Sequence, residues 1–157
     1  MTETDYLSLA TAINTRVDTF NAYLESAHHL EHICLEQPTT AHWIEDSSWG
    51  SIWPSKDSYG VYFLVGHRVD CPAEQGMYIG KASYGRRIGN RLYAHLLHGA
   101  KSKRYFKKAP DGTQFQIQML FAIPMPNGMR AFGSALEEHL IHELKGELYL
   151  LNRVGNK

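Results

Sequence analysis

The sequence predicts an α/β (α+β) fold in which a small three-stranded, mainly antiparallel sheet is flanked by helices. Two short apolar segments that each contain a tyrosine, 60–62 and 78–80, have the composition of the two strands of a hairpin. Residues 113–123 alternate between apolar and polar side chains, which is typical of a half-buried strand. Apolar residues recur at helical spacings in 85–99 and 130–145, so one helix should follow the hairpin and another the third strand.

The first part of the chain, residues 1–58, is expected to be an N-terminal helical extension with a connector, ahead of a domain formed by residues 59–157. The total of 157 residues suits one compact domain. Helical spacing of apolar residues over 5–36, without proline or glycine, predicts one long helix or two. The turn-rich stretch 37–58 holds three tryptophans, which suit core packing or stacking on nucleic-acid bases: Trp43, Trp49 and Trp53.

Turn residues and composition predict the remaining segments. Gly66, Pro72 and Gly76 are expected in the connector of the hairpin. Residues 101–110 combine lysines with two aromatic residues and are expected to form an exposed basic loop. Residues 148–152 could add a short edge strand at the end of the chain.

Composition argues against a membrane protein and against ordinary secretion. No apolar run is long enough to span a bilayer, and the start of the chain lacks the basic-then-apolar pattern of a signal peptide. The two cysteines, Cys34 and Cys71, are too few for a disulfide framework and lack the spacing of a redox motif. We therefore expect a cytoplasmic protein without a membrane partner.

The net charge of zero conceals a strong segregation of charge along the chain. Residues 1–59 hold 2 basic and 9 acidic side chains, whereas residues 81–108 hold 9 basic side chains and no acidic one. Such a basic block is typical of a surface that binds a polyanion, although a solvated basic face is the plainer alternative. We expect nucleic-acid contacts from the following side chains: Arg86, Arg87, Lys101, Lys103, Arg104, Lys107 and Lys108.

Five short motifs follow one another in a recognisable order between about residues 59 and 153. They are Gly60-Val61-Tyr62, Tyr78-Ile79-Gly80-Lys81-Ala82, Arg91-Leu92-x-x-His95, Leu136-Glu137-x-x-Leu140-Ile141, and Asn152. This series resembles the GIY-YIG nuclease superfamily. Each motif alone is weak, whereas the five in this order form a fairly specific pattern.

The resemblance implies an endonuclease that hydrolyses DNA phosphodiester bonds with Mg²⁺ or Mn²⁺. It implies that Tyr62 is the general base for the attacking water, that Tyr78 holds the water or the phosphate, and that Arg91 neutralises charge in the transition state. Glu137 would be the metal ligand, since Mg²⁺ accepts one carboxylate together with waters and substrate phosphate. A nearby arginine, Lys81 or the metal could lower the pKa of a tyrosine, which is near 10 in a free side chain. Asn152 would brace the site.

Two assignments stay open at this stage. Arg86 and Arg87 compete with Arg91, because family members often have the helix arginine about ten residues after the second tyrosine, whereas Arg91 lies thirteen residues after Tyr78. Glu138 competes with Glu137 on composition, but the apolar stripe of the helix makes Glu137 the better match.

A different class of function remains as the alternative. The chain could be a non-catalytic nucleic-acid-binding or inhibitory module that retains the fold, or a protein-interaction domain that uses its acidic N-terminal helix. For the nuclease, a homo-oligomer is attractive, because a duplex needs two cuts and each chain offers one site. Salt dependence of DNA binding would separate the protein-interaction domain from the other classes, since phosphate contacts weaken steeply as salt rises.

Overall fold

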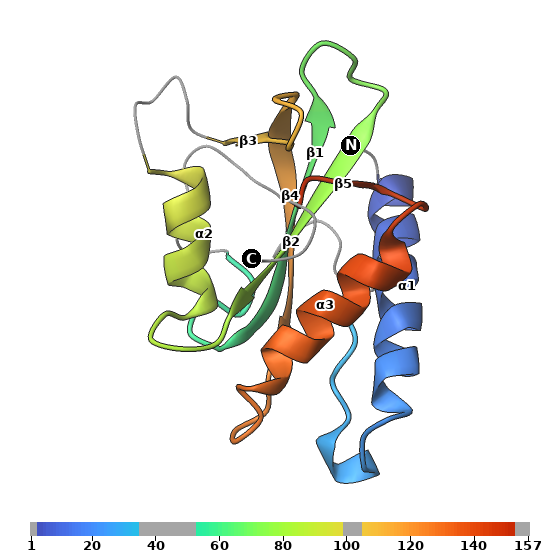
Figure 1. The fold of residues 1–157 in the computed structure, drawn as a ribbon, viewed down its shortest axis with the longest axis vertical. Coiled ribbons are helices and arrows are strands. Elements are labelled where there is room, and N and C mark those ends of the chain that lie inside the picture. The colour runs from blue at the N-terminus through green and yellow to red at the C-terminus, as the bar shows by residue number, and fades with distance from the viewer. Residues whose placement is uncertain (1–2, 35–52, 99–104, 153–157) are drawn as a thin grey trace.

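The computed structural model describes residues 3–34, 53–98 and 105–152, with side chains from residue 7 onward. In chain order the elements are α1 (Glu3–Asn21), a short 3-10 helix (Ser26–His28), β1 (Gly60–Arg68), β2 (Gln75–Ala82), α2 (Ile88–Leu96), β3 (Phe106–Lys108), β4 (Gln114–Pro124), α3 (Phe132–Leu144) and β5 (Tyr149–Leu150). Figure 1 shows α2 on one side of the sheet and α1 together with α3 on the other. The fold is therefore α+β, as the sequence predicts.

The sheet has five strands, so the prediction of a three-stranded sheet is wrong. The strand order is β3-β4-β1-β2-β5, and β1 is antiparallel to both β2 and β4. The three predicted strands are these central ones. The two remaining strands lie at the edges. The two-residue β5 falls within the short edge strand expected at 148–152, whereas the three-residue β3 lies in the segment expected to be a basic loop. A segment as short as β3 shows no alternation that a sequence pattern could reveal.

The hairpin strands are longer than predicted, because Gly66 and Gly76 pair with each other within β1 and β2. Neither glycine forms part of the connector, which contradicts the sequence interpretation. A Cβ atom at Gly66 would lie 2.1 Å from the backbone oxygen of Gln116, next to a bulge in the pairing with β4. A Cβ at Gly76 would lie 2.7 Å from the ring of Phe115. Both glycines permit close approach within the sheet.

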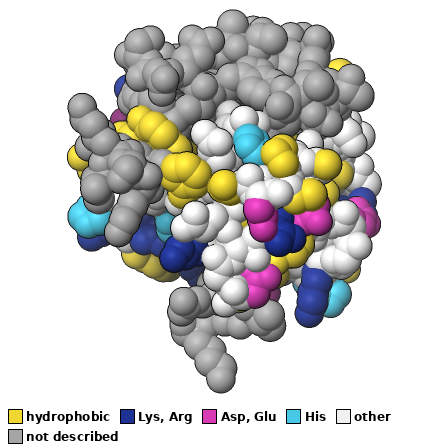
Figure 2. All heavy atoms as spheres, turned by 90° about the horizontal axis from the view of Figure 1, so that it is seen from above, with side chains coloured by type: hydrophobic (Ala, Val, Ile, Leu, Met, Phe, Trp, Pro, Cys, Tyr) yellow, Lys and Arg dark blue, Asp and Glu magenta, His cyan; other side chains and the backbone are white. Residues whose placement is uncertain are grey.

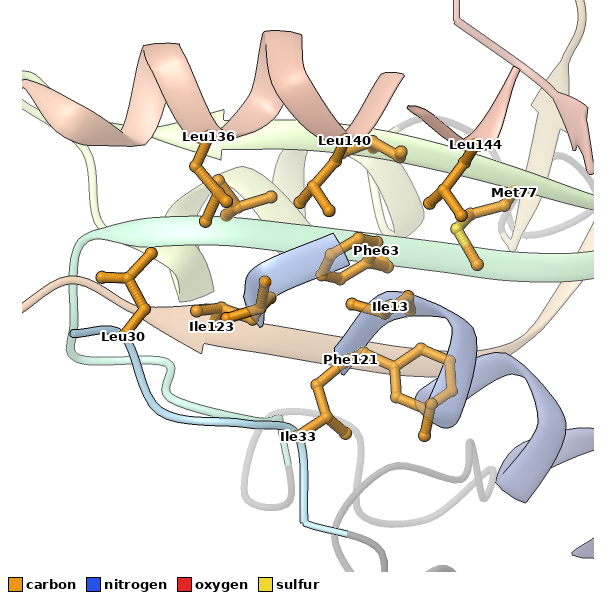
Figure 3. Close-up of a cluster of buried hydrophobic side chains, with 14 of the residues drawn as sticks. Ile13, Leu30, Ile33, Phe63, Met77, Phe121, Ile123, Leu136, Leu140 and Leu144 are labelled. Carbon is orange, nitrogen blue, oxygen red and sulfur yellow. The ribbon is translucent and has the colours of Figure 1, made fainter. Parts of the chain in front are cut away.

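Alternation along the strands sends successive side chains to opposite faces of the sheet. Phe63, Ile79 and Phe121 lie on the face covered by α1 and α3, in a large apolar cluster. Figure 3 shows Leu136, Leu140 and Leu144 of α3 pointing toward this face, while Ile13 of α1 reaches the same cluster. The opposite face, under α2, holds a second cluster that includes Tyr62, Leu64, Ile88, Leu92 and Trp53.

The N-terminal helix ends at Asn21, whereas the helical spacing predicted one long helix or two over residues 5–36. Beyond the 3-10 helix the chain is irregular, and Leu30 and Ile33 pack into the apolar cluster from a non-helical segment. Asn21 accepts a hydrogen bond from the Leu30 amide and donates one to its carbonyl, at 2.8 and 3.1 Å. Asn14 makes the same pair with Ile33, at 2.7 and 2.9 Å. These two buried asparagines satisfy backbone groups that a helix would have satisfied itself.

The third of the tryptophans predicted in the connector, Trp53, lies in the core under α2, whereas Trp43 and Trp49 fall outside the described residues. Within the described residues, no helix combines the length and the apolar character that crossing a bilayer requires.

Candidate active site

The two motif tyrosines lie on the same face of the sheet. Tyr62 of β1 is paired with Gly80 of β2, and Leu64 is paired with Tyr78. Because neighbours two residues apart share a face, the two rings project together toward α2, with their centroids 6.3 Å apart. The side chain of Tyr62 is fully buried, whereas Tyr78 is half-buried.

Gly80 makes room for the first tyrosine. A Cβ atom at this position would lie 2.4 Å from Cζ and 2.5 Å from the hydroxyl oxygen of Tyr62. The ring of Tyr62 therefore lies across the backbone of the neighbouring strand. The glycine of the second motif and the tyrosine of the first are thus two parts of one packing arrangement.

A histidine and a lysine complete this cluster. His95 of α2 has its Nε2 atom 2.9 Å from the hydroxyl oxygen of Tyr62. Its other ring nitrogen, Nδ1, lies 3.0 Å from Nζ of Lys107. The Lys107 ammonium also lies 3.8 Å from the centroid of the Tyr78 ring, close enough for a cation–π interaction.

Sequence reasoning gave these two residues no role in the cluster. His95 belongs to the quoted helix motif, four residues after Arg91, and this spacing places both side chains on one face of α2. That spacing is the signal that could have identified it. Lys107 was expected to contact nucleic acid from an exposed loop, but it lies half-buried on β3, with its ammonium among the aromatic rings.

Of the three candidate arginines, Arg91 is the one that reaches the tyrosines. Its guanidinium lowers the pKa of Tyr62 and of Tyr78, against the larger opposite effect of burial. Its Nε atom is buried and has no hydrogen-bond partner among the described residues. Arg87 instead precedes α2 and donates to the backbone oxygen of Asp57 at 2.9 Å. Arg86 is exposed to solvent.

Burial has the largest effect on the pKa values of the two tyrosines. It raises the pKa of Tyr62, and the neighbouring Tyr78 and the carboxylate of Glu137 raise it further. Burial followed by the charge of Glu137 likewise raises the pKa of Tyr78. Both hydroxyls therefore keep their protons at neutral pH. Arg91 opposes this rise in the pKa of Tyr62, and the expectation that a nearby arginine, Lys81 or the metal makes a tyrosine lose its proton more readily stays a prediction.

The pKa values of the two basic side chains in the cluster, His95 and Lys107, are lowered. Burial, followed by the charges of Lys107 and Arg91, lowers the pKa of His95 to about 3. Burial and the charge of Arg91 lower the pKa of Lys107 to about 8. At pH 7 the imidazole is therefore neutral, while the ammonium is largely protonated.

Glu137 and Lys81 form a pair beside this cluster. The side chain of Lys81 lies on the opposite face of the sheet from the tyrosines. Successive residues of a strand alternate between the two faces, and Lys81 comes three residues after Tyr78 in β2. Its Nζ atom is 3.2 Å from Oε2 of Glu137, whose side chain is only 5% exposed. Glu138 is exposed, so Glu137 is the acid of α3 that faces the sheet. Its effect on the tyrosine pKa values shows that its charge reaches across the β2 strand.

Asn152 holds the second motif strand by its backbone. Its side-chain oxygen accepts a hydrogen bond from the amide of Ile79 at 2.9 Å, and its amide nitrogen donates to the Ile79 carbonyl at 2.6 Å. Because Ile79 lies between Tyr78 and Gly80, these two bonds fix the backbone from which the second tyrosine projects. The side chain is buried, so both bonds are protected from water.

The other residues expected to contact nucleic acid divide into two groups. Lys108 is exposed on β3, as are Arg86 and Arg87 before α2. Lys101, Lys103 and Arg104 fall outside the described residues.

Charges at the tip of the β1–β2 hairpin are mutually compensated. Arg68 there pairs with Asp70 and Glu74, at 2.6 and 2.9 Å. Figure 2, which views this end of the molecule, shows acidic and basic side chains next to one another in the middle of the view and further basic side chains gathered to the left.

The acidic and histidine side chains around the tyrosines fit a Mg²⁺ ion held by one carboxylate better than a structural zinc site. Among the described residues, no group of three or more His, Cys, Asp or Glu side chains gathers in one place. Zinc sites use such groups, whereas Mg²⁺ keeps several waters and needs only one or two carboxylates together with substrate phosphate. Glu137 could supply that carboxylate. In the structure this carboxylate forms an ion pair with Lys81.

Comparisons with family models, curated proteins and solved structures found no significant match to this chain.

Proposed function

We propose that this chain is a Mg²⁺-dependent endonuclease of the GIY-YIG type that hydrolyses DNA phosphodiester bonds. The observation that supports this most strongly is the gathering of Tyr62, Tyr78 and Arg91 on one face of the sheet, with Glu137 within electrostatic range. These are the residue types that phosphodiester hydrolysis requires, and they come from the five motifs in their expected order.

Binding of a phosphate is supported by cations that lack acidic partners. In the part of the chain that the structure describes, neither Arg91 nor Lys107 forms an ion pair, and the Arg91 Nε atom has no hydrogen-bond partner. A partly buried cation without a counter-ion is costly unless a ligand supplies one. A phosphodiester would supply this charge, and Arg91 would then stabilise the negative charge that develops during the reaction.

In the proposed mechanism Tyr62 takes the proton of the attacking water, and Tyr78 orients the water or the phosphate. Tyr62 must first lose its own proton, and the guanidinium of Arg91 favours that loss. Glu137 would hold the metal ion and release Lys81, which could then contact the substrate. The bound Mg²⁺ would supply neutralisation of charge on the phosphate and on the departing oxygen.

A cleavage assay with purified protein tests the proposal. Plasmid, linear duplex and single-stranded DNA are incubated with Mg²⁺, with Mn²⁺, and with a chelator as the control. We expect strand breaks that depend on the divalent ion. DNA that is bound by the protein but remains uncut with either ion would refute the nuclease.

One observation favours the second candidate function, a non-catalytic nucleic-acid-binding module. The proposed base has a raised pKa and the proposed metal ligand is paired with a lysine, so the site as described is not in a reactive arrangement. Such a module would bind DNA with an affinity that falls steeply with salt, and it would do so without cleaving it. The same assay, run beside a binding titration, separates the two functions.

A further inference from the structure

The ammonium of Lys107 is half-buried in a place where no carboxylate of the described residues neutralises it. Its strand β3 is held to β4 through the pairing of Lys107 with Phe115. From there its side chain runs inward, and its ammonium ends 3.0 Å from His95 Nδ1 and 3.8 Å from the centre of the Tyr78 ring. Among the described residues no carboxylate pairs with it. A half-buried ammonium in this setting costs stability, which its lowered pKa also records.

The hydrogen-bonding capacity of an ammonium constrains the histidine beside it. A protonated lysine has three donors and no acceptor, so His95 Nδ1 must be the acceptor of this hydrogen bond. The imidazole is neutral, because burial and the charges of Lys107 and Arg91 lower the pKa of His95 to about 3. A neutral imidazole has only one N–H group. Its proton must therefore be on Nε2.

The position of this proton determines what His95 does to Tyr62. Nε2 is the ring atom that lies 2.9 Å from the hydroxyl oxygen of Tyr62, so the histidine donates and the phenolic oxygen accepts. A hydrogen bond donated to this oxygen stabilises the phenolate. In the other tautomer, Nε2 would accept the proton of Tyr62 and would favour the neutral phenol.

We propose that Lys107 is a positioning residue, which fixes His95 in the tautomer that donates a hydrogen bond to Tyr62. Lys107 itself need not touch the substrate. The importance of this tautomer for catalysis rests on the proposed function, whereas the tautomer is a property of the protein without DNA or metal. The charged and titratable groups around the pair are Arg91 from α2, Tyr62 and Tyr78 from the sheet, and Glu137 from α3 acting at longer range.

The first experiment measures the tautomer of His95 directly. Protein labelled with ¹⁵N in its histidines is studied at pH 6.5 by long-range ¹H–¹⁵N correlation, and His95→Gln assigns the signal. We expect an unprotonated Nδ1 and a protonated Nε2 in the parent protein. Finding the proton on Nδ1, or on both nitrogens, would overturn the proposal without any need for a variant.

Substitution of the lysine is the second test. Lys107→Met keeps a side chain of similar length but removes the ammonium, so the Nδ1–H tautomer should appear. Lys108→Met is the matched control, because Lys108 is the exposed neighbour on the same strand and its loss should leave the His95 signals unchanged. If His95 keeps a pure Nε2–H tautomer in Lys107→Met, another group fixes it and the proposal fails.

The third test raises the pH of the parent protein. The pKa of Lys107 is about 8, so the same appearance of the Nδ1–H tautomer should accompany its deprotonation. A tautomer that remains unchanged well above pH 8 would contradict the role of the ammonium. This test needs no substitution, so it does not depend on Lys107→Met folding.

The NMR measurements and DNA cleavage have separable outcomes. If the parent cleaves DNA, Lys107→Met should lower the rate by about tenfold or more, the size expected when a partner that orients a functional group is lost. If the parent does not cleave DNA, the proposed function fails, while the tautomer result still supports or refutes the role of Lys107.

Discussion

The two faces of the sheet use the same strands for different purposes. The face under α1 and α3 is packed with aliphatic and aromatic side chains, as Figure 3 shows. The face under α2 buries two tyrosines, a histidine, a lysine and an arginine among its apolar residues, and the pKa of several of them is displaced by burial. The first face supplies stability. On the second face, the burial of polar groups costs part of that stability.

This division occurs at the level of single residues in β2. Ile79 points into the apolar cluster, while Tyr78 and Gly80 on either side of it form part of the polar face. The backbone of Ile79 is in turn fixed by Asn152. A packed residue therefore anchors the strand from which the functional residue projects. Substitutions on the apolar face should therefore change mainly stability, whereas substitutions on the polar face should also change the local environment of the tyrosines and His95.

The largest effect on stability is expected from the apolar face. Leu140→Ala removes a fully buried side chain from the cluster under α3. It should lower the free energy of unfolding by about 2–5 kcal/mol, because it leaves a cavity as well as losing apolar burial. Urea denaturation measures this loss. Leu7→Ala, at a position that is 39% exposed, is the control and should change stability by less than about 0.5 kcal/mol. Equal losses at both positions would contradict the packing described.

Gly80→Ala would crowd the polar face, on which Gly80 and Tyr62 lie side by side. The new methyl group would overlap with the ring of Tyr62, so the strand or the tyrosine must move. Overpacking of this kind costs about 1–3 kcal/mol, and the NMR signals of His95 and Tyr62 should shift with it. Gly133→Ala is the matched control, because a methyl group there meets nothing closer than 4.0 Å. If Gly80→Ala is as stable as this control, Tyr62 does not lie across β2.

Asn152→Ala tests the anchor of the second tyrosine. It removes both hydrogen bonds to the backbone of Ile79, each contributing about 1 kcal/mol. Stability should fall by roughly 2 kcal/mol on that basis. Hydrogen exchange of the Ile79 amide should also become faster, which is a local measurement. Asn127→Ala, at an exposed turn position, should change neither quantity. Unchanged exchange at Ile79 would show that β2 is held by other contacts.

The smallest effect is a pH dependence that originates on the α2 side. The pKa of His95 is about 3 in the folded protein, whereas an unfolded histidine has a pKa near 6.5. As pH falls below about 6.5, the unfolded chain binds a proton that the folded protein does not bind, so stability decreases. This one group contributes a slope of at most about 1.4 kcal/mol per pH unit. Denaturation of His95→Gln between pH 6.5 and 5 should show a shallower slope, and identical slopes would mean that His95 becomes protonated in the fold.

Local patterns in the sequence predict the central elements and the short edge strand β5, but not β3 at the opposite edge. The strands around Tyr62, Tyr78 and Phe121 and the helix of Glu137 follow from alternation or helical spacing, and each has the predicted type. Leu30 and Ile33 have helical spacing too, yet their segment is irregular because Asn14 and Asn21 satisfy its backbone. That arrangement depends on contacts between residues that are distant in sequence. No local period reveals it.

The candidate site shows the same limit. Which arginine reaches the tyrosines depends on where α2 begins, and because it begins at Ile88, Arg86 and Arg87 precede the helix. Lys107 enters the site because β3 pairs with β4, and a strand of three residues is too short to be seen as a pattern. Residue types and their order therefore indicate which chemistry is present. The partners of each side chain come from pairings that only the fold reveals.

The nuclease itself is tested most directly by nicking of supercoiled plasmid with Mg²⁺, comparing the parent with Tyr62→Phe and Glu137→Gln. Glu138→Gln, at the exposed neighbouring acid, is the matched control. We expect the parent and the control to nick the plasmid, and both site variants to remain folded but lose at least about a hundredfold in rate. Tyr62→Phe removes the proposed general base, and Glu137→Gln removes the proposed metal ligand. A parent that binds the plasmid without nicking it, or site variants that cut as fast as the parent, would contradict the proposed function.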